Sequence, residues 1–405
     1  MSTPAPVPRR VLAPDLARGA MLLLIALANV PAYLWGPGQG LSATAFHPPS
    51  TDLLDRIVQA VTIVTIDGRV YPMFTFLLGY GMWQFARARR AQGVPEPDVR
   101  RLLRRRHLGL LLIGAVHAAL LFSGDVLGAY GILGLVMVPL FFACSSRTLA
   151  WWCAGLTVAL LVFLGMSAAL DMLFGAADPA ALDAAEGFFP VPNVETDYLA
   201  AMGGRLLIWG ISTPTTALIG SILPSLVLLS WIAARAEVLE RPGDHLPLLR
   251  RVAAIGIAIG WLGGIPAAAV HLGVLPAAHL SWALTLSMVS GFVCGVGYVA
   301  AFALLAHRLT LAELSGATEG TLRRVLVATG RASLTCYLFQ SVVFAPLFDA
   351  WGLGAGEHVG SAAAAGIAVL TWAASALLAT WLLRTGRRGP GEIALRRITG
   401  SSRPA

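Results

Sequence analysis

The amino-acid sequence predicts an all-α, polytopic integral membrane protein with about ten transmembrane helices. Of its 405 residues, 57% are hydrophobic and 12% are charged, and the mean hydropathy is +0.74. Soluble globular chains carry about 25% charged residues. The apolar residues are gathered into long runs, and almost every arginine falls between these runs. These observations exclude an ordinary soluble domain.

Each predicted span is an apolar stretch near the length of about 20 residues that crosses a bilayer as a helix. The ten stretches are residues 16–35, 69–86, 107–123, 125–143, 148–173, 213–234, 252–273, 279–306, 324–348 and 361–383. No repeat with a period of about 20–50 residues is visible. We therefore expect one multi-pass membrane domain over residues 1–405, and an even number of spans places both ends on the same side.

The distribution of arginine predicts which side that is. All 29 basic residues are arginines, and 25 of them lie in the tails or in connections on one side. The tails are residues 1–14 and 384–405, and the connection at residues 87–106 holds eight arginines. The opposite loop at residues 174–203 is acidic and holds none. Connections rich in arginine stay cytoplasmic, so we expect cytoplasmic tails in a plasma or inner membrane.

The same distribution explains the net charge of +8 without a nucleic-acid partner, because the arginines lie in short loops beside apolar spans. Two arginines and an apolar run at residues 9–28 resemble a signal peptide. However, Asp15 and Arg18 lie directly before or inside that run, where the core of a signal peptide is uncharged. We expect a retained first span.

Four arginines break the pattern: Arg56, Arg69, Arg205 and Arg331. The first and third fall in segments predicted to be amphipathic and outer, near residues 53–66 and 198–212. The other two fall at or inside spans and require a partner or a function.

The cysteines and several glycines are predicted to serve helix packing. The cysteines, all in or at the ends of spans, are Cys144, Cys153, Cys294 and Cys336. We expect neither disulfides nor zinc, and no set of His, Asp and Glu has the spacing of metal ligands. The glycines at four-residue spacing, which let helices approach closely in lipid, are Gly256, Gly260, Gly264, Gly291 and Gly295.

Ionisable residues inside the predicted spans fall at two depths. The inner set is Asp15, Arg18 and Arg331, with Arg104, Arg105 and Arg106 just below. Asp15 and Arg18 are three residues apart and share a helix face. Two interpretations stay open. One is an ion pair of Asp15 with Arg331 or Arg18 that locks helices, and the other is a basic vestibule for the phosphates of a cytosolic ligand.

The outer set is Asn29, Arg69, His117, Asp125 and Gln340. His117 and Asp125 flank a turn at Gly124, so an antiparallel hairpin would place both side chains in its outer half. Asn29 lies about 21 Å beyond Asp15 along its helix, at a similar depth. A histidine with a carboxylate partner can act as a general base near neutral pH. The alternative is a histidine that is hydrogen-bonded only for helix packing.

Six short motifs follow one another along the chain between residue 10 and residue 400. They are Asp15–Ala20 with Arg10 and Asn29, Phe74–Gly81, Arg105–Arg106 with His117, Gly124–Leu127 with Tyr130, Gly330–Ser341, and Gly389–Pro390 with Glu392 and Arg396. Together they resemble the YeiB-like family, which holds domain of unknown function 418. Ala394 and Leu395 depart from the tryptophan region of that family's tail pattern.

The resemblance implies kinship with transmembrane acyltransferases such as heparan-glucosaminide acetyltransferase and the acyltransferase 3 family. These are thought to pass an acyl group from cytosolic acyl-CoA to an acceptor, often a sugar, across the membrane. The acyltransferase 3 family carries Arg, ten residues and then His in its first span. Here Arg18 is followed at that spacing by Asn29. Because an amide is not a useful base near pH 7, His117 with Asp125 would have to supply the base.

The leading hypothesis is therefore acyl transfer from acyl-CoA to a small-molecule or sugar acceptor. The residues expected to hold the CoA phosphates are Arg18, Arg105, Arg106 and Arg331. The catalytic candidates are His117 as base, Asp125 as its orienting partner, and Asn29 or Arg69 for the oxyanion. The remaining polar candidates, for substrate binding or structure, are Asp15, Arg69, Tyr130 and Gln340.

Two other function classes stay open. A transporter or export component would use the same polar groups to line a pathway. Helix breaks are common in transporters, and Pro214 and Pro224 are candidates for such breaks. A non-catalytic scaffold would have no cavity between the two polar layers. The lipid bilayer is an expected partner in each case, and the sequence leaves open whether the chain forms a homodimer.

Overall fold

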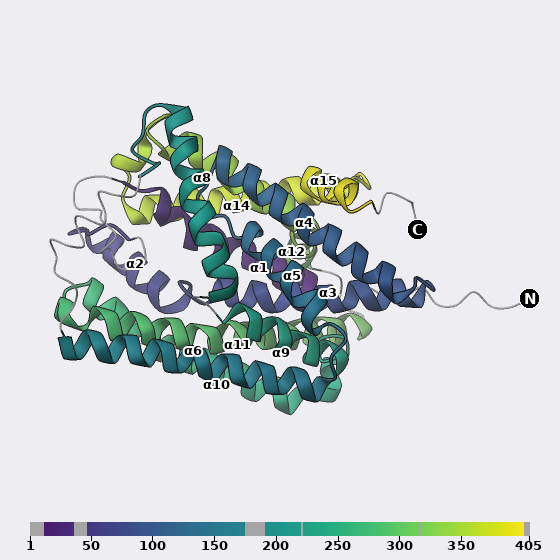
Figure 1. Ribbon diagram of the computed structural model, residues 1–405. Coiled ribbons are helices and arrows are strands. Elements are labelled where there is room, and N and C mark those ends of the chain that lie inside the picture. The colour runs from purple at the N-terminus through teal and green to yellow at the C-terminus, as the bar shows by residue number, and fades with distance from the viewer. Residues whose placement is uncertain are drawn as a thin grey trace, which may run out of the picture.

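The computed structural model describes residues 12–35, 47–174, 191–219, 222–315, 318 and 320–400. Within these ranges every regular element is a helix (Figure 1), so the predicted all-α fold class is confirmed. Parts of four predicted regions lie outside the described residues: the N-terminal tail up to residue 11, residues 175–190 of the acidic loop, residues 220–221 of the span predicted at 213–234, and residues 401–405 of the C-terminal tail.

The first half of the chain forms α1 (Leu12–Asn29), η1 (Val30–Tyr33), α2 (Leu53–Thr65), α3 (Val70–Ala91), α4 (Glu96–Leu120), α5 (Leu127–Phe141) and α6 (Ser146–Phe174). The second half forms α8 (Tyr198–Pro214), η3 (Thr215–Ile219), α9 (Leu223–Arg235), η4 (Pro242–His245), α10 (Leu246–His271), η5 (Ala277–His279), α11 (Leu280–Leu314), α12 (Thr321–Arg331), α13 (Ser333–Phe348), η6 (Ala355–Glu357), α14 (Ser361–Arg384) and α15 (Pro390–Thr399).

Several of these helices have the length and composition needed to cross a membrane. Among the described residues, six segments qualify: Leu12–Tyr33, Leu53–Ala91, Ser146–Leu170, Pro242–His271, Ala277–Leu314 and Ser361–Arg384. A seventh is formed if α8 and α9, which meet at a bend of 48°, count as one span. The helices α5 and α13 are apolar but shorter. This set of helices is that of a multi-pass membrane protein.

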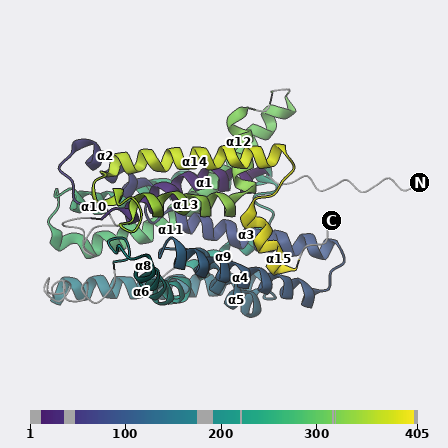
Figure 2. The same ribbon diagram turned by 90° about the horizontal axis from the view of Figure 1, so that it is seen from above.

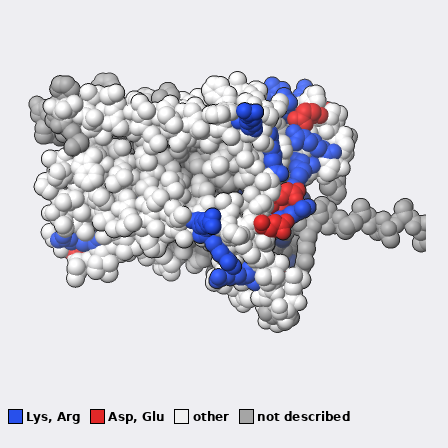
Figure 3. Space-filling view, turned by 90° about the horizontal axis from the view of Figure 1, so that it is seen from below, with Lys and Arg blue, Asp and Glu red and all other residues white. Residues whose placement is uncertain are grey.

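The helix α1 lies inside the bundle and packs against α3, α11, α12, α13 and α14. Figure 2 shows α14 beside α1, with α6 on the opposite side of the molecule. Charged side chains gather toward one end of the face seen in Figure 3, and an uncharged band covers most of the rest. That division is expected of a protein whose middle is surrounded by lipid.

Glycines on α10 and α11 bring these two helices into close contact, as their spacing predicts. A Cβ added at Gly260 would lie 2.2 Å from the Cβ of Cys294, and one at Gly263 would lie 2.2 Å from the Ser290 hydroxyl. Gly291 and Gly295 instead accommodate the backbone at the start of α3. Small residues therefore position the connection between α2 and α3 as well as the helix pair.

Replacing Gly260 by leucine is expected to lower the free energy of unfolding by at least about 1–3 kcal/mol, the usual cost of overpacking. Thermal unfolding of the detergent-solubilised protein measures the change. The matched control is Gly155→Leu on α6, where an added Cβ meets nothing within 4 Å. Equal melting temperatures for the two variants would contradict the proposed packing role.

The stretch predicted as one span over residues 324–348 is divided in the structure, so that prediction was wrong. The helix α12 ends at Arg331, and α13 begins at Ser333. Glu392 of α15 caps the new helix. Its Oε1 accepts hydrogen bonds from the backbone N–H groups of Leu334 at 2.8 Å and Thr335 at 3.3 Å. The first N–H groups of a helix lack partners within that helix, so a carboxylate supplied from the tail stabilises the break.

Replacing Glu392 by glutamine is expected to cost about 1–2 kcal/mol of stability, because a charged cap is exchanged for a weaker neutral acceptor. The loss would be measured as a lower melting temperature. Glu357→Gln, at an exposed carboxylate of η6, serves as control and should change little. A neutral outcome at both positions would argue against the cap.

Candidate functional site

His117 and Asp125 form a buried, hydrogen-bonded pair at the turn between α4 and α5. Nδ1 of His117 lies 2.8 Å from Oδ1 of Asp125, and the two side chains are 1% and 0% exposed. The predicted hairpin therefore does bring them together. Gly114, one turn before His117, makes room for the carboxylate, since a Cβ there would lie 2.5 Å from Oδ2 of Asp125.

The other carboxylate oxygen of Asp125 is held in place. Oδ2 accepts hydrogen bonds from the Gly128 N–H at 2.8 Å and from Nε1 of Trp209 on α8 at 3.4 Å. An ionised Asp125 can only accept hydrogen bonds, so it selects the His117 tautomer that carries its proton on Nδ1. Nε2 of His117 then presents a lone pair.

That Nε2 atom is buried and has no hydrogen-bond partner among the described residues. The His117 ring lies 5.3 Å from the ring of Tyr337 and 6.4 Å from that of Phe122, measured between centroids. Most buried side-chain polar atoms in proteins are paired. An oriented imidazole with an unpaired acceptor nitrogen is the arrangement that a general base requires.

Three other predicted residues pack in the bundle interior or near its outer end. Tyr130 stacks on Phe74 with ring centroids 4.9 Å apart, and its hydroxyl donates to the Tyr71 carbonyl at 3.3 Å. Gln340 donates from Nε2 to the Leu22 carbonyl at 2.9 Å, tying α13 to α1. Asn29 is partly buried where α1 passes into η1.

Arg69, which was grouped with His117 from the sequence, has a different place in the fold. It is completely buried between α3, α10 and α11. Its guanidinium donates to the Ser287 hydroxyl at 3.0 Å, to the Gly260 carbonyl at 2.8 Å and to the Asp67 carbonyl. These hydrogen bonds supply a donor to the Asp67 carbonyl, at the break between α2 and α3, and join that break to α10 and α11. The contacts of Arg69 are therefore structural, and the fold does not bring Arg69 to the pair of His117 and Asp125, which we call the dyad.

At the charged end, Asp15 lies between two arginines. Its carboxylate is 3.6 Å from Arg18 of the same helix and 3.6 Å from Arg331 of α12. Both of the predicted ion pairs are therefore present. The contact between α1 and α12 depends on Gly19 and Gly330, because a Cβ at either would lie 1.9 Å from a backbone carbonyl oxygen of the other helix.

The predicted phosphate ligands are only partly brought together. Arg106 lies near enough to Arg18 and Glu392 to interact electrostatically with both. Arg331 joins this group through Asp15. Arg105 lies beside Gly400 at the end of α15. Arg18 and Arg106 are thus neighbouring cations, a placement that favours an anion between or beside them.

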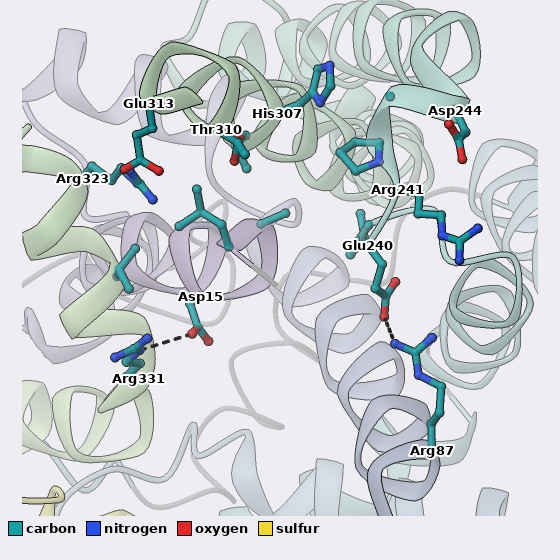
Figure 4. A pocket seen from close by; sticks show the side chains of 17 residues that line it. Asp15, Arg87, Glu240, Arg241, Asp244, His307, Thr310, Glu313, Arg323 and Arg331 are labelled. Atoms are coloured by element: carbon teal, nitrogen blue, oxygen red, sulfur yellow. Dashed lines mark hydrogen bonds and ion pairs between the residues drawn. The ribbon is translucent and has the colours of Figure 1, made fainter. Parts of the chain in front are cut away.

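A cavity of about 710 Å³ opens next to this group. Figure 4 shows Asp15, Arg331, Arg323 and Glu313 on one side of it and Glu240, Arg87, Arg241 and Asp244 on the other. Each side thus carries two arginines and two carboxylates, so the charges of these eight lining residues balance. Arg87 contacts Glu240 at 3.0 Å, and Arg323 pairs with Glu313. The volume falls in the range of about 300–1,000 Å³ that is usual for small-ligand pockets.

Sequence reasoning missed Trp209, Tyr337 and most of the charged residues that line the cavity. Trp209 and Tyr337 lie in apolar runs and look like packing residues until the fold places them beside Asp125 and His117. The lining residues had looked like ordinary loop charges. The ion pair of Arg205 with Asp349 was also missed, although the sequence carries a signal for it, because Arg205 departs from the arginine pattern.

Comparisons with known proteins agree with the motifs. Residues 233–402 match the family described as "Protein of unknown function (DUF418)". Over 400 residues, the chain is 26% identical to "Uncharacterized protein YeiB" of Escherichia coli, covering 95% of each chain. Over 356 residues, it is 27% identical to "Uncharacterized protein YxaH" of Bacillus subtilis, covering 85% of this chain and 80% of that protein. The predicted family relationship is confirmed.

Proposed function

The chain belongs to the DUF418 family, and we propose that it is a membrane-embedded acyltransferase that uses cytosolic acyl-CoA. In this proposal about ten helical segments cross a plasma or inner membrane, α13 taking the place of the divided stretch, with the arginine-rich end in the cytoplasm. The observation that supports the chemistry best is the buried His117–Asp125 pair, whose Nε2 atom has no partner among the described residues.

Acyl-CoA would supply a thioester carbonyl for attack by an acceptor hydroxyl or amine. Nε2 of His117 takes the acceptor's proton as that bond forms, and returns it to the leaving thiolate. Asp125 keeps Nδ1 protonated and stabilises the imidazolium that forms in between. The surrounding rings of Phe122 and Tyr337 keep bulk water from the base, which strengthens these electrostatic effects.

The cationic neighbours Arg18 and Arg106 are the residues that fit the phosphates of the donor. Arginine presents a fork of donors that matches phosphate oxygens. Arg331, like Arg18, lies 3.6 Å from Asp15, and its proposed role is to hold the inner network in place beside the phosphate site. Asn29 stays a candidate for the oxyanion, whereas the hydrogen bonds of Arg69 argue against that role for it.

The decisive experiment measures acyl-CoA binding and transfer separately. Radiolabelled acetyl-CoA would be titrated onto the detergent-solubilised protein, and proteoliposomes would then be assayed for acetylation of glucosamine as a probe acceptor. We expect binding that Arg106→Gln weakens about tenfold, the loss of one charge-assisted contact, while Arg396→Gln on exposed α15 does not. Wild-type protein that binds no acetyl-CoA would refute the proposal.

A second candidate, transport, is favoured by the cavity at the charged end. Its four arginines and four carboxylates suit a ligand that carries both charges better than a polyanion. The 48° bend between α8 and α9 is also a feature that transporters use. This candidate predicts that proteoliposomes accumulate a radiolabelled zwitterion such as alanine, without any need for acetyl-CoA.

A further inference from the structure

A second buried polar pair lies near the dyad, at the opposite end from the arginine-rich network. Arg205 of α8 is 1% exposed, and its Nη1 atom lies 3.8 Å from Oδ2 of Asp349, the residue that follows α13. The guanidinium lies under two aromatic rings, 5.3 Å from the Tyr198 centroid and 5.9 Å from that of Trp351. The pair is therefore shielded from solvent.

The hydrogen bonds of this pair are incomplete. Nε of Arg205 donates to the Ala119 carbonyl at 3.1 Å, but neither Nη1 nor Nη2 has a hydrogen-bond partner among the described residues. Oδ1 of Asp349 has none either, although its Oδ2 accepts from Nε1 of Trp351 at 3.0 Å. A buried guanidinium with two unused nitrogens is costly, and such groups in native proteins call for an explanation such as a bound ligand.

The pair lies in the neighbourhood of the proposed base, because Tyr33 interacts electrostatically with Arg205, with Asp349 and with Asp125. Ala119, which accepts from Arg205, is two residues beyond His117, a rise of about 3 Å along α4. Arg205 and Trp209 are four residues apart on one face of α8, and Trp209 donates to Asp125. One helix face thus joins the guanidinium to the carboxylate that orients His117 (Figure 1 shows α8 beside α4).

The ionisation of Asp349 controls how far Arg205 is neutralised. Burial raises the pKa of Asp349 to about 7, with Trp351 and Arg205 acting in the opposite direction. The charged or titratable groups around the pair are Tyr33 of η1, Tyr198 of α8 and the two partners themselves. A protonated Asp349 leaves the positive charge of Arg205 without a counter-ion.

We propose that Arg205 binds a phosphate or carboxylate group of the acceptor, with Asp349 as its stand-in when no acceptor is present. The anionic group would form a two-pronged contact with Nη1 and Nη2, and the acceptor's hydroxyl or amine would reach Nε2 of His117. The acceptor is therefore an anionic molecule that reaches from Arg205 on α8 to His117 on α4. The role given to His117 rests on the proposed acyl transfer. The binding of an anion by Arg205 is independent of it.

Binding is tested with sn-glycerol 3-phosphate as a soluble probe and with phosphatidylglycerol in nanodiscs as a lipid probe. Titration calorimetry would follow the first and native mass spectrometry the second. We expect Arg205→Gln to weaken the bound probe at least tenfold, and Arg205→Lys, which keeps the charge but loses the fork, to weaken it less. Arg396→Gln, at an exposed position of α15, should leave this binding unchanged.

The variant Asp349→Asn separates the proposal from a purely structural ion pair. Removing the competing carboxylate should tighten probe binding. It should also abolish a pH dependence that, in the wild type, amounts to about a tenfold loss of affinity from pH 6 to pH 8 for a group of pKa about 7. A structural pair predicts lower stability and no gain in affinity.

The outcomes are distinguishable. Binding of the soluble probe or of the lipid alone identifies the source of the anionic group, and either supports the inference. Absence of binding to both, or equal binding by wild type and Arg205→Gln, overturns it. Anion binding by a protein that binds no acetyl-CoA would uphold this site and refute the acyltransferase proposal.

Discussion

Replacing His117 by alanine is expected to lower the rate of acyl transfer by about 10²–10⁴-fold, the usual contribution of a positioned general base. Binding of acetyl-CoA should stay within about twofold of wild type, because the proposed phosphate site near Arg106 lies about 16 Å from His117 along α4. The measurements are the initial rate in proteoliposomes and the dissociation constant in detergent.

Asp125→Asn should reduce the rate nearly as strongly, because an amide can accept at its oxygen or donate at its nitrogen and no longer selects one imidazole tautomer. His107 offers a matched control on the same helix. It is also buried, and its Nε2 likewise has no partner among the described residues, but its Nδ1 bonds the Leu103 carbonyl at 2.8 Å instead of a carboxylate. His107→Ala should therefore cost stability while sparing the catalytic rate per folded molecule. Full activity in His117→Ala would remove the dyad from the mechanism.

The largest expected effect on stability is that of Arg69→Ala, at about 3–5 kcal/mol, because several buried acceptors lose their donor at about 1–3 kcal/mol each. The substitution leaves the Gly260 carbonyl and the Ser287 hydroxyl without their donor and opens a cavity between three helices. Thermal unfolding in detergent, with expression yield as a second readout, would measure the loss.

Arg56→Ala is the matched control for that prediction. Arg56 also departs from the arginine pattern, but it is only partly buried and donates to the Leu272 carbonyl at 3.0 Å. Its loss should cost no more than about 1 kcal/mol, as for other single hydrogen bonds near the surface. Similar melting temperatures for the two alanine variants would show that Arg69 does not hold the α2–α3 break.

Much of the fold could be predicted because two constraints apply to short stretches of sequence. A span must be long enough to cross the bilayer, and its backbone polar groups must form hydrogen bonds within the helix because lipid offers none. The helical spans, the α4–α5 hairpin and the pairing of His117 with Asp125 follow from apolar length and short spacing. The break at Ala332 could not be predicted in this way. Its cap, Glu392, is about 60 residues away in sequence, and only the folded chain brings a tail carboxylate to that helix start.

The sequence by itself determined the helical membrane class, the family and the residues that are out of place in lipid, because apolar length, arginine position and motif order are properties of the chain. Only the tertiary structure decided which of those residues meet. It put Arg69 on backbone carbonyls, Asp15 between two arginines and Arg205 beside Asp349. The physical reason is that helices far apart in sequence choose partners by packing, where glycines permit contact and buried polar atoms need one another.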